Sequence, residues 1–302
     1  MISAQAEQIV VLYRDWVSRQ TPDMTEVDAR ALFSEWTTLT SEPDDVRYEE
    51  IELETCGAMW ILPDERDDGK VLLCSHGGGY IGGSMQVHRK FFGHVAKAAG
   101  CRALNVDYRL APEFPHPASV HDMTAAYRWL ITDQGYAPDH IALVGDSAGG
   151  ALALTNIANM RKRGLPFPAA TMPLSPWACR DTSSPSYQTN IDNDVLTRRE
   201  LSSWIADLVL GPDGDWRDPL INPFYVDYAG FPPIYLQVGG YEAILDDSTR
   251  IADCARNANV DVKIDVFPQM QHCFQLMAGN APEADDAVAR LAQWVRPLLG
   301  IG

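Results

Sequence analysis

The sequence predicts an α/β fold in which a mostly parallel sheet carries helices on both faces. Short apolar runs alternate along the chain with helix-forming segments, which is the pattern of strand–helix–strand units. One unit is especially clear: the apolar run Ile141–Val144 leads into Gly145–Gly150 and then into the helix-forming run Ala151–Ala158. With 302 residues, of which 46% are hydrophobic and 22% charged, the chain can bury a full core.

The first 40 residues predict two amphipathic helices. Apolar residues between Ile9 and Val17 fall on one helical face, Pro22-Asp23 interrupts the pattern, and Ala31–Trp36 marks a second helix. Helices that precede the sheet in the chain either pack beneath it or cover another part of the fold. Aromatic stripes of this kind usually belong to a core, but here they can also line a lid.

The sheet is expected to begin at residue 46. The segments Val46–Glu54 and Cys56–Leu62, followed by a polar turn at 63–69, suggest an antiparallel start. Further strands are expected at Val71–Cys74, Ala103–Val106, Ile141–Val144, Ala169–Leu174, Ile234–Val238 and Val262–Phe267. Helices are expected between them at about 86–99, 118–133, 151–158 and 246–258, and at the end of the chain at about 283–299.

Between about 180 and 230 this alternation fails. One helix, Leu201–Leu210, stands there among loop-forming residues, and no strand is expected. A long excursion of this kind indicates an insertion that caps the sheet. We therefore expect N-terminal cap helices over 1–45 and a catalytic domain over 46–302 that carries a cap insertion at about 180–230.

Composition argues against several classes of partner. A net charge of −17 is unsuited to nucleic acid, whose phosphates need clustered Lys and Arg, and to an anionic membrane surface. No apolar run approaches the roughly 20 residues of a membrane span, and no secretory signal is visible. The six cysteines lack metal-binding spacing, and Cys74 and Cys101 in apolar runs are expected to be buried thiols. We expect a cytoplasmic protein without metal or cofactor.

The strand–turn–helix context makes Ser147 a candidate nucleophile. Gly-x-Ser-x-Gly between a strand and a helix is typical of a nucleophile elbow, a turn so tight that the serine backbone is strained. Gly145 and Gly149 fit this turn because a side chain at either position would meet the neighbouring strand or helix. The alternative is a turn of small residues in which the serine has no catalytic role. Candidate catalytic partners elsewhere in the chain decide between the two interpretations.

Downstream of Ser147 the chain has one histidine, His272, on a loop after the strand Val262–Phe267. An elbow nucleophile is followed in chain order by its acid and then by its base. His272 is therefore the expected general base, placed where an imidazole reaches over the sheet edge.

The orienting acid is expected just after the strand Ile234–Val238. Glu242 is nearest to the strand end and is our first choice, with Asp246 as second. Asp246 and Asp247 are typical of residues that cap the next helix by accepting its first free N–H groups. Either acid serves the chemistry, because a carboxylate need only fix the imidazole tautomer and stabilise its positive charge.

Glycines 77–79 follow the strand Val71–Cys74 at the edge where ligands gather in α/β sheets. Their backbone N–H groups can turn outward, and we expect Gly77 and Gly78, together with Ala148 behind the nucleophile, to hold an oxyanion. No Lys-Ser/Thr follows, which argues against a phosphate loop, and a flexible turn is the plain alternative. His76 is expected to shape the loop by hydrogen bonding.

With these pieces, the chain resembles the bacterial hormone-sensitive lipase family of α/β-hydrolase esterases from about Val71 to Trp294. His76–Tyr80 is similar to the family's oxyanion motif, and Asp107–Ala118 to its signature after the next strand. Gly145–Gly150 is similar to its Gly-Asp-Ser-Ala-Gly-Gly elbow, and His272 stands where its base does. The resemblance implies an α/β-hydrolase fold with a helical cap, serine esterase activity and no cofactor. One departure is Glu242, where the family usually has Asp.

The leading functional hypothesis is a serine carboxylic-ester hydrolase acting on short to medium acyl esters or lactones through an acyl-enzyme. Lactones compete with linear esters, since proteins similar to this family include monoterpene and caprolactone hydrolases. Aromatic residues of the insertion suggest an apolar pocket without choosing a substrate: Trp177, Trp204, Trp216, Phe224 and Tyr225.

Two other hypotheses come from different classes. One is a non-catalytic small-molecule receptor on the same scaffold, although such proteins have lost the histidine. The other is a metal hydrolase that uses Asp246, Asp247 and His272, residues that lack any recognised zinc spacing. Family members often dimerise through the last strand, so a homodimer formed by Val262–Phe267 is a further expectation.

Overall fold

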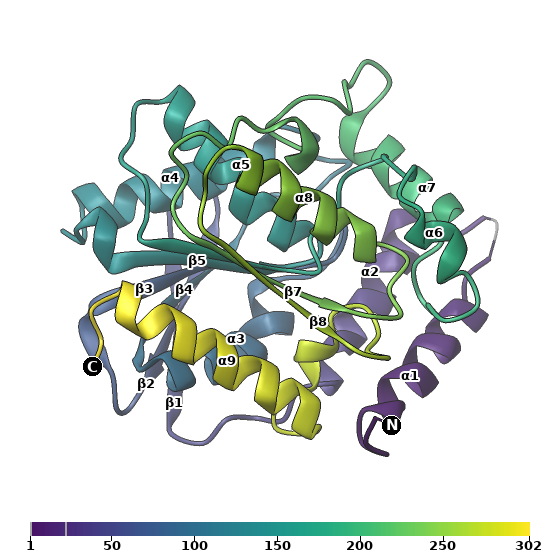
Figure 1. Cartoon of the computed structure of the whole chain (residues 1–302), viewed down its shortest axis with the longest axis horizontal. Coiled ribbons are helices and arrows are strands. Elements are labelled where there is room, and N and C mark those ends of the chain that lie inside the picture. The colour runs from purple at the N-terminus through teal and green to yellow at the C-terminus, as the bar shows by residue number, and fades with distance from the viewer. Residues whose placement is uncertain (1, 22) are drawn as a thin grey trace.

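The computed structural model, which describes residues 2–21 and 23–302, contains an eight-stranded sheet in the order β1-β2-β4-β3-β5-β6-β7-β8 (Figure 1). Strand β2 runs antiparallel to both of its neighbours, and the remaining neighbouring pairs are parallel. The strands are β1 (Val46–Glu52), β2 (Gly57–Pro63), β3 (Asp67–Ser75), β4 (Cys101–Asp107), β5 (Ile141–Asp146), β6 (Ala170–Leu174), β7 (Ile234–Gly239) and β8 (Val262–Phe267).

Helices cover both faces of this sheet (Figure 1). On one face α3 (Met85–Ala99) packs against α9 (Pro282–Leu298), and on the other α4 (Ala118–Thr132) packs against α5 (Ala148–Lys162), with α8 (Leu245–Asn257) beside them. Each face has its own buried hydrophobic cluster. This three-layer arrangement confirms the α/β fold that the alternating sequence pattern predicts.

The strands and helices begin and end close to the predicted residues, because their signals are strong. β5 is buried along its whole length, as expected for a parallel strand covered on both faces. The main difference is β3, which begins at Asp67, inside the expected polar turn. The Asp67 N–H donates to the Gly100 carbonyl at 2.8 Å, and the pairing with β4 is irregular between Asp67 and Val71.

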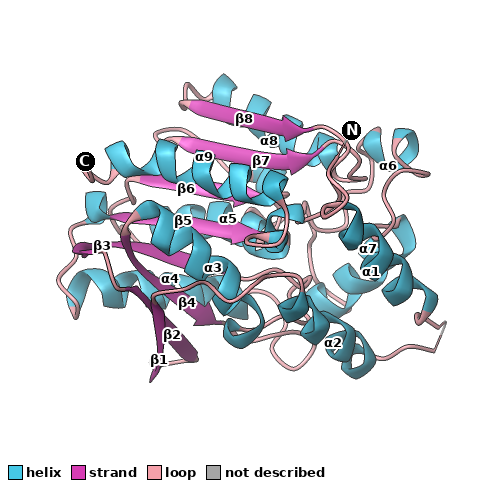
Figure 2. Cartoon of the chain, turned by 90° about the horizontal axis from the view of Figure 1, so that it is seen from below, coloured by secondary structure: helices cyan, strands magenta, loops and turns pink. Residues whose placement is uncertain are grey.

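Two N-terminal helices lie beyond the carboxyl ends of the strands, together with α7 (Arg199–Leu210) (Figure 2). They are α1 (Glu7–Ser18) and α2 (Glu26–Ser34), and α2 begins with a capping box between Thr25 and Asp28. The predicted break between the two helices is Pro22-Asp23, of which Pro22 lies outside the described residues.

The structure also bears on the predictions about the cysteines and about membrane-spanning segments. Cys74 and Cys101 are fully buried thiols, as predicted, and all six cysteines are free. Within the described residues, no helix combines the length and the apolar character needed to cross a membrane.

Candidate active site

Ser147 sits in the tight turn between β5 and α5, in a strained conformation. Its φ of 53° and ψ of −120° lie outside the ordinary regions for a residue with a side chain, a conformation that costs roughly 1–3 kcal/mol. A Cβ at Gly145 would overlap the Gly149 carbonyl, and one at Gly149 would overlap the Ser75 carbonyl. The glycines are therefore needed for the close approach of α5 to β5 and β3, as the sequence predicted.

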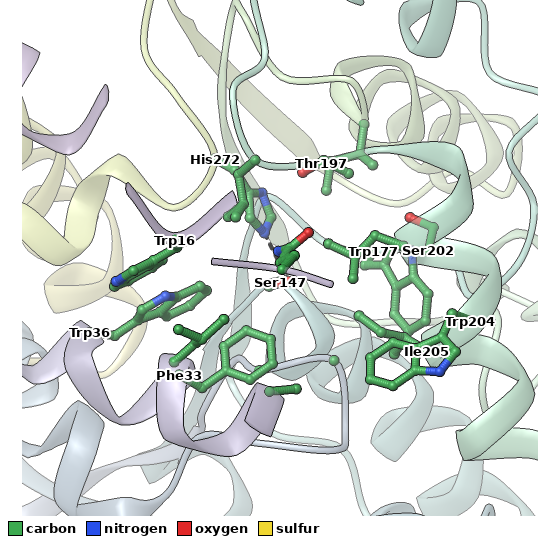
Figure 3. Close-up of a pocket in the computed structure, with 18 of the residues that line it drawn as sticks. Trp16, Phe33, Trp36, Ser147, Trp177, Thr197, Ser202, Trp204, Ile205 and His272 are labelled. Carbon is green, nitrogen blue, oxygen red and sulfur yellow. Dashed lines mark hydrogen bonds between the residues drawn. The ribbon is translucent and has the colours of Figure 1, made fainter. Parts of the chain in front are cut away.

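The fold brings Ser147, His272 and Glu242 into one hydrogen-bonded chain. His272 Nε2 lies 2.9 Å from Ser147 Oγ (Figure 3). On the other side of the ring, His272 Nδ1 lies 2.8 Å from Glu242 Oε2. The three residues come from the loops after β5, β8 and β7, all at the carboxyl edge of the sheet. Ser147 is 8% exposed and His272 is 5% exposed, so the hydrogen bonds between these residues are shielded from bulk water.

The pKa values of His272 and Glu242 are both raised, His272 by its carboxyl partner and Glu242 by burial. Burial lowers the pKa of His272, but the hydrogen bond and the charge of Glu242 raise it, and the net direction is upward. For Glu242, burial outweighs the hydrogen bonds from His272, Ser175 and the Gly239 N–H, and the pKa of the carboxyl is raised above its usual range. An imidazole that gains a proton here is stabilised where the reaction needs it.

Sequence reasoning missed the second support of the acid, Ser175. Its hydroxyl donates to Glu242 Oε1 at 2.6 Å, and the Gly239 N–H donates to the same oxygen. Ser175 follows β6 directly and is fully buried with a φ of 43°. A serine at the carboxyl end of a parallel strand, on the edge shared with Ser147, was the signal available.

Asp246 and Asp247 make their hydrogen bonds with residues other than His272, and the capping role predicted for them is wrong. Helix α8 begins with no side-chain cap. Asp246 accepts the Ser186 N–H at 2.8 Å, while Asp247 accepts the Ser184 hydroxyl at 2.6 Å. Both carboxylates therefore tie α8 to the segment after β6, and Glu242 is the acid that is hydrogen-bonded to the imidazole.

The glycine loop requires a correction to the predicted oxyanion donors. The Gly77 N–H is already used, since it donates to Asp146 Oδ1 at 3.0 Å, and Gly77 does not line the cavity. Gly78 and Gly79 do line it, and their N–H groups donate to no acceptor among residues 2–21 and 23–302. Ala148, the first residue of α5, has no intrahelical acceptor for its N–H.

Beneath this loop lies a buried polar group that holds Gly77. Asp146 is 3.4 Å from His88 Nε2, and both side chains are almost fully buried. His76 lies beside them, stacked on the Tyr108 ring at 4.2 Å, and its Nδ1 contacts the Gly77 carbonyl. Burial, and then the neighbouring His88, lower the pKa of His76 to about 4. The sequence predicted that His76 shapes the loop by hydrogen bonding, and the structure adds that the ring does so in its uncharged form.

A narrow apolar cavity of about 80 Å³ opens over Ser147 and His272. In Figure 3 one wall comes from the N-terminal helices and the other from Trp177 and α7. The larger side chains of these walls are Trp16, Phe33, Trp36, Trp177, Trp204 and Ile205. Three predicted aromatics lie elsewhere: Trp216 packs on Tyr225, and Phe224 lies beneath Arg250. The N-terminal aromatics take their place.

Comparison with known proteins places this geometry in a family. The sequence profile of the α/β hydrolase fold matches residues 72–276. A crystal structure described as an esterase from the bacterial hormone-sensitive lipase family superposes with a TM-score of 0.94 at 39% identity, covering 99% of this chain and 100% of the other. The chain belongs to the bacterial hormone-sensitive lipase family of α/β hydrolases. The predicted resemblance is confirmed.

Relatives within the family carry esterase names. An acetyl-hydrolase of Streptomyces hygroscopicus is 36% identical over 247 residues, which cover 82% of each chain. The carboxylesterase NlhH of Mycobacterium tuberculosis is 32% identical over 234 residues, covering 76% of this chain and 73% of the other. This family member is accordingly an enzyme of the carboxylesterase class.

Proposed function

We propose that this family member hydrolyses carboxylic esters through an acyl-enzyme, with Ser147 as nucleophile, His272 as general base and Glu242 as the acid that orients the base. The observation that carries the proposal is the unbroken hydrogen-bond chain from Ser147 Oγ to the Glu242 carboxylate. The strained elbow supports it by lifting the hydroxyl from the sheet edge. Relatives named acetyl-hydrolase and carboxylesterase support an ester as substrate.

In the first half of the reaction, His272 Nε2 accepts the Ser147 proton as Oγ attacks the ester carbonyl carbon. The carbonyl oxygen becomes an oxyanion, and we assign its hydrogen bonds to the N–H groups of Gly78, Gly79 and Ala148. The tetrahedral intermediate then collapses, and the alcohol leaves with the proton from His272. In the second half, His272 deprotonates a water molecule as it attacks the acyl carbon, and then returns that proton to Ser147 Oγ as the carboxylic acid leaves.

The cavity favours short acyl groups. Its volume of about 80 Å³ is well below the roughly 300–1,000 Å³ of pockets that hold drug-sized ligands. Indole and phenyl rings surround it, so an extended chain or a bulky ring has to displace them. We therefore place acetyl to butyryl esters ahead of terpene or macrolide lactones, with a small ring such as caprolactone between them.

The primary experiment compares Ser147→Ala with the wild-type enzyme on p-nitrophenyl acetate. Loss of the nucleophile should lower kcat on the order of 10⁴–10⁶-fold. A fluorophosphonate probe should label the wild type and leave the variant unlabelled. Ser248→Ala is the matched control, because Ser248 is a buried serine of α8 outside the cavity. Wild-type turnover by Ser147→Ala would refute the proposal, and an unlabelled wild type would favour the receptor alternative.

The substrate class is tested by kcat/KM for p-nitrophenyl acetate, butyrate and octanoate, alongside ε-caprolactone and a macrolide lactone. We expect kcat/KM to fall steeply beyond the butyryl ester. A macrolide hydrolysed faster than the acetyl ester would overturn the size argument.

Three further predictions remain part of this proposal. We assign cap roles to residues 1–45 and about 180–230, and a cytoplasmic location in keeping with six free thiols. The edge strand β8 exposes 45% of Val266, which suits pairing with a second copy. Light scattering of the wild type against Val266→Lys tests the homodimer, which should become monomeric in the variant.

A further inference from the structure

Helix α1 reaches the catalytic base from the far end of the sequence. The Tyr13 hydroxyl donates to the main-chain carbonyl of His272 at 2.8 Å, a contact between residues 259 positions apart. Tyr13 is fully buried, and no other hydrogen bond to this carbonyl is found among the described residues. Helix α2 makes a similar contact with the main chain. Arg30 Nε donates at 2.7 Å to the carbonyl of Ile81, which lies just beyond the oxyanion loop.

Tyr13 does not line the cavity, so a substrate would not touch it. Its ring packs on Trp16 and Trp36 at centroid distances of 5.2 and 6.3 Å, and these two indoles stack on each other at 5.7 Å. Both indoles do line the cavity. The hydroxyl of Tyr13 thus points at the base while its ring supports the wall that binds substrate.

The loop that carries His272 needs such a contact. It runs without regular structure from the end of β8 to Phe274. Cys273, directly after the base, has a φ of 53°, a left-handed conformation that is unfavourable for a residue with a side chain. Without the Tyr13 hydroxyl, the buried His272 carbonyl would also lose its hydrogen bond, which is unfavourable for a polar group shielded from water. Relaxation of the loop is the easiest way to relieve both.

We propose that Tyr13 is a positioning residue for catalysis, whose hydroxyl holds the backbone of His272 so that the imidazole stays within hydrogen-bond reach of Ser147 and Glu242. The first helix of the chain is then part of the catalytic machinery as well as a wall of the cavity. This inference rests on the proposed role of His272 as base. Burial, and then nearby Cys273 and Glu242, hold the pKa of Tyr13 well above its usual 10, so the hydroxyl stays a donor at every working pH.

The test is Tyr13→Phe, which removes one oxygen and keeps the ring. Tyr127→Phe is the matched control, because the Tyr127 hydroxyl of α4 donates to the Pro166 carbonyl at 2.9 Å in a layer away from the cavity. Each variant loses one hydrogen bond to a carbonyl, so each Tm should fall by a similar amount, about 2–4 °C. Only Tyr13→Phe should lose activity.

We expect Tyr13→Phe to lower kcat for p-nitrophenyl acetate about tenfold with KM within about twofold, since a small misplacement of a catalytic group is costly. The rate of fluorophosphonate labelling should fall by a similar factor, because labelling needs the same activated serine. The low-field Nδ1–H resonance of His272 should move in the proton NMR spectrum, a change that lost stability alone would not produce.

The inference is overturned if Tyr13→Phe keeps kcat within about twofold of wild type. It is also overturned if KM rises while kcat is unchanged, which would assign Tyr13 to substrate binding, or if Tyr127→Phe loses as much kcat. Failure of the proposed function looks different. In that case the wild type itself fails to turn over esters, or Ser147→Ala remains active.

Discussion

Replacing Glu242 with Gln tests the triad through the hydrogen bonds around one side chain. The carboxylate accepts from His272 on Oε2 and from Ser175 and the Gly239 N–H on Oε1. A Gln amide has one oxygen and one NH₂ group, so it cannot accept on both sides. If NH₂ faces His272, Nδ1 must become the acceptor, and the proton moves to Nε2, which can then no longer accept the Ser147 proton.

If NH₂ instead faces the Gly239 N–H, two donors meet in a buried site, which costs about 1–3 kcal/mol, and the charge that stabilises the imidazolium is lost. Both orientations impair the base. We expect kcat for p-nitrophenyl acetate to fall about 10³–10⁴-fold, where the upper value is the loss known for an acid-to-amide change that imposes the wrong tautomer. That range corresponds to about 4–5.5 kcal/mol of transition-state stabilisation.

Asp246→Asn is the matched control, because Asp246 makes its hydrogen bond with the Ser186 N–H and not with His272. Its kcat should stay within about threefold of wild type. Circular dichroism and Tm establish that both variants fold. A Glu242→Gln enzyme within tenfold of wild type would refute the assignment, and loss of activity in Asp246→Asn alone would transfer the role to Asp246.

Three further predictions use other parts of the site. Catalysis needs a neutral imidazole, and the pKa of His272 is raised above its usual 6.5 because Glu242 outweighs burial. We therefore expect kcat/KM to be half-maximal above pH 6.5 and to be lost on acidification. A midpoint well below pH 6.5 would contradict the coupling of His272 to Glu242. Burial raises the pKa of Asp247 to about 8 from 3.8 in the unfolded chain, so the folded state binds the extra proton and stability falls as pH rises from about 4 to about 8. In Asp247→Asn the amide oxygen can accept the Ala178 N–H while the NH₂ group donates to Ser184 Oγ, whose hydroxyl can also accept. Tm should then vary less with pH over that interval, and an unchanged slope would exclude Asp247 as its source. Gly77→Ala should lower kcat at least 10²-fold, because its Cβ would overlap Asp146 Oδ2 and lie 3.1 Å from Asp146 Cγ, and near-normal activity would show that the loop can shift freely.

Much of the fold and the triad could be predicted because the deciding signals are local or follow chain order. The strand–glycine–serine–glycine–helix pattern places Ser147 without any knowledge of tertiary contacts. His272 followed from being the one histidine downstream, and Glu242 from its place at a strand end. The structure brings these three residues together because the carboxyl ends of parallel strands share one edge.

Features that depend on contacts across the sheet could not be predicted. Whether Gly77 or Gly79 offers a free N–H depends on the Asp146 side chain, which folds back under the loop and occupies Gly77. The cavity wall formed by Trp16 and Trp36 depends on where the N-terminal helices settle, and a helical period shows only that one face is buried. Asp246 and Asp247 fit a helix-cap pattern, but their partners come from a loop about 60 residues away.

The glutamate at position 242 fits where the family resemblance leads one to expect aspartate, because its longer side chain is fixed at two points. One oxygen accepts from Ser175 and from Gly239, three residues earlier in the same turn, which leaves the other oxygen for His272. An extra methylene adds rotamer freedom that folding must remove, and two donors on a single buried oxygen offset that loss. With one oxygen held in this way, the other lies 2.8 Å from His272 Nδ1. Ser175, at the end of the neighbouring strand, therefore helps a glutamate to serve at this position.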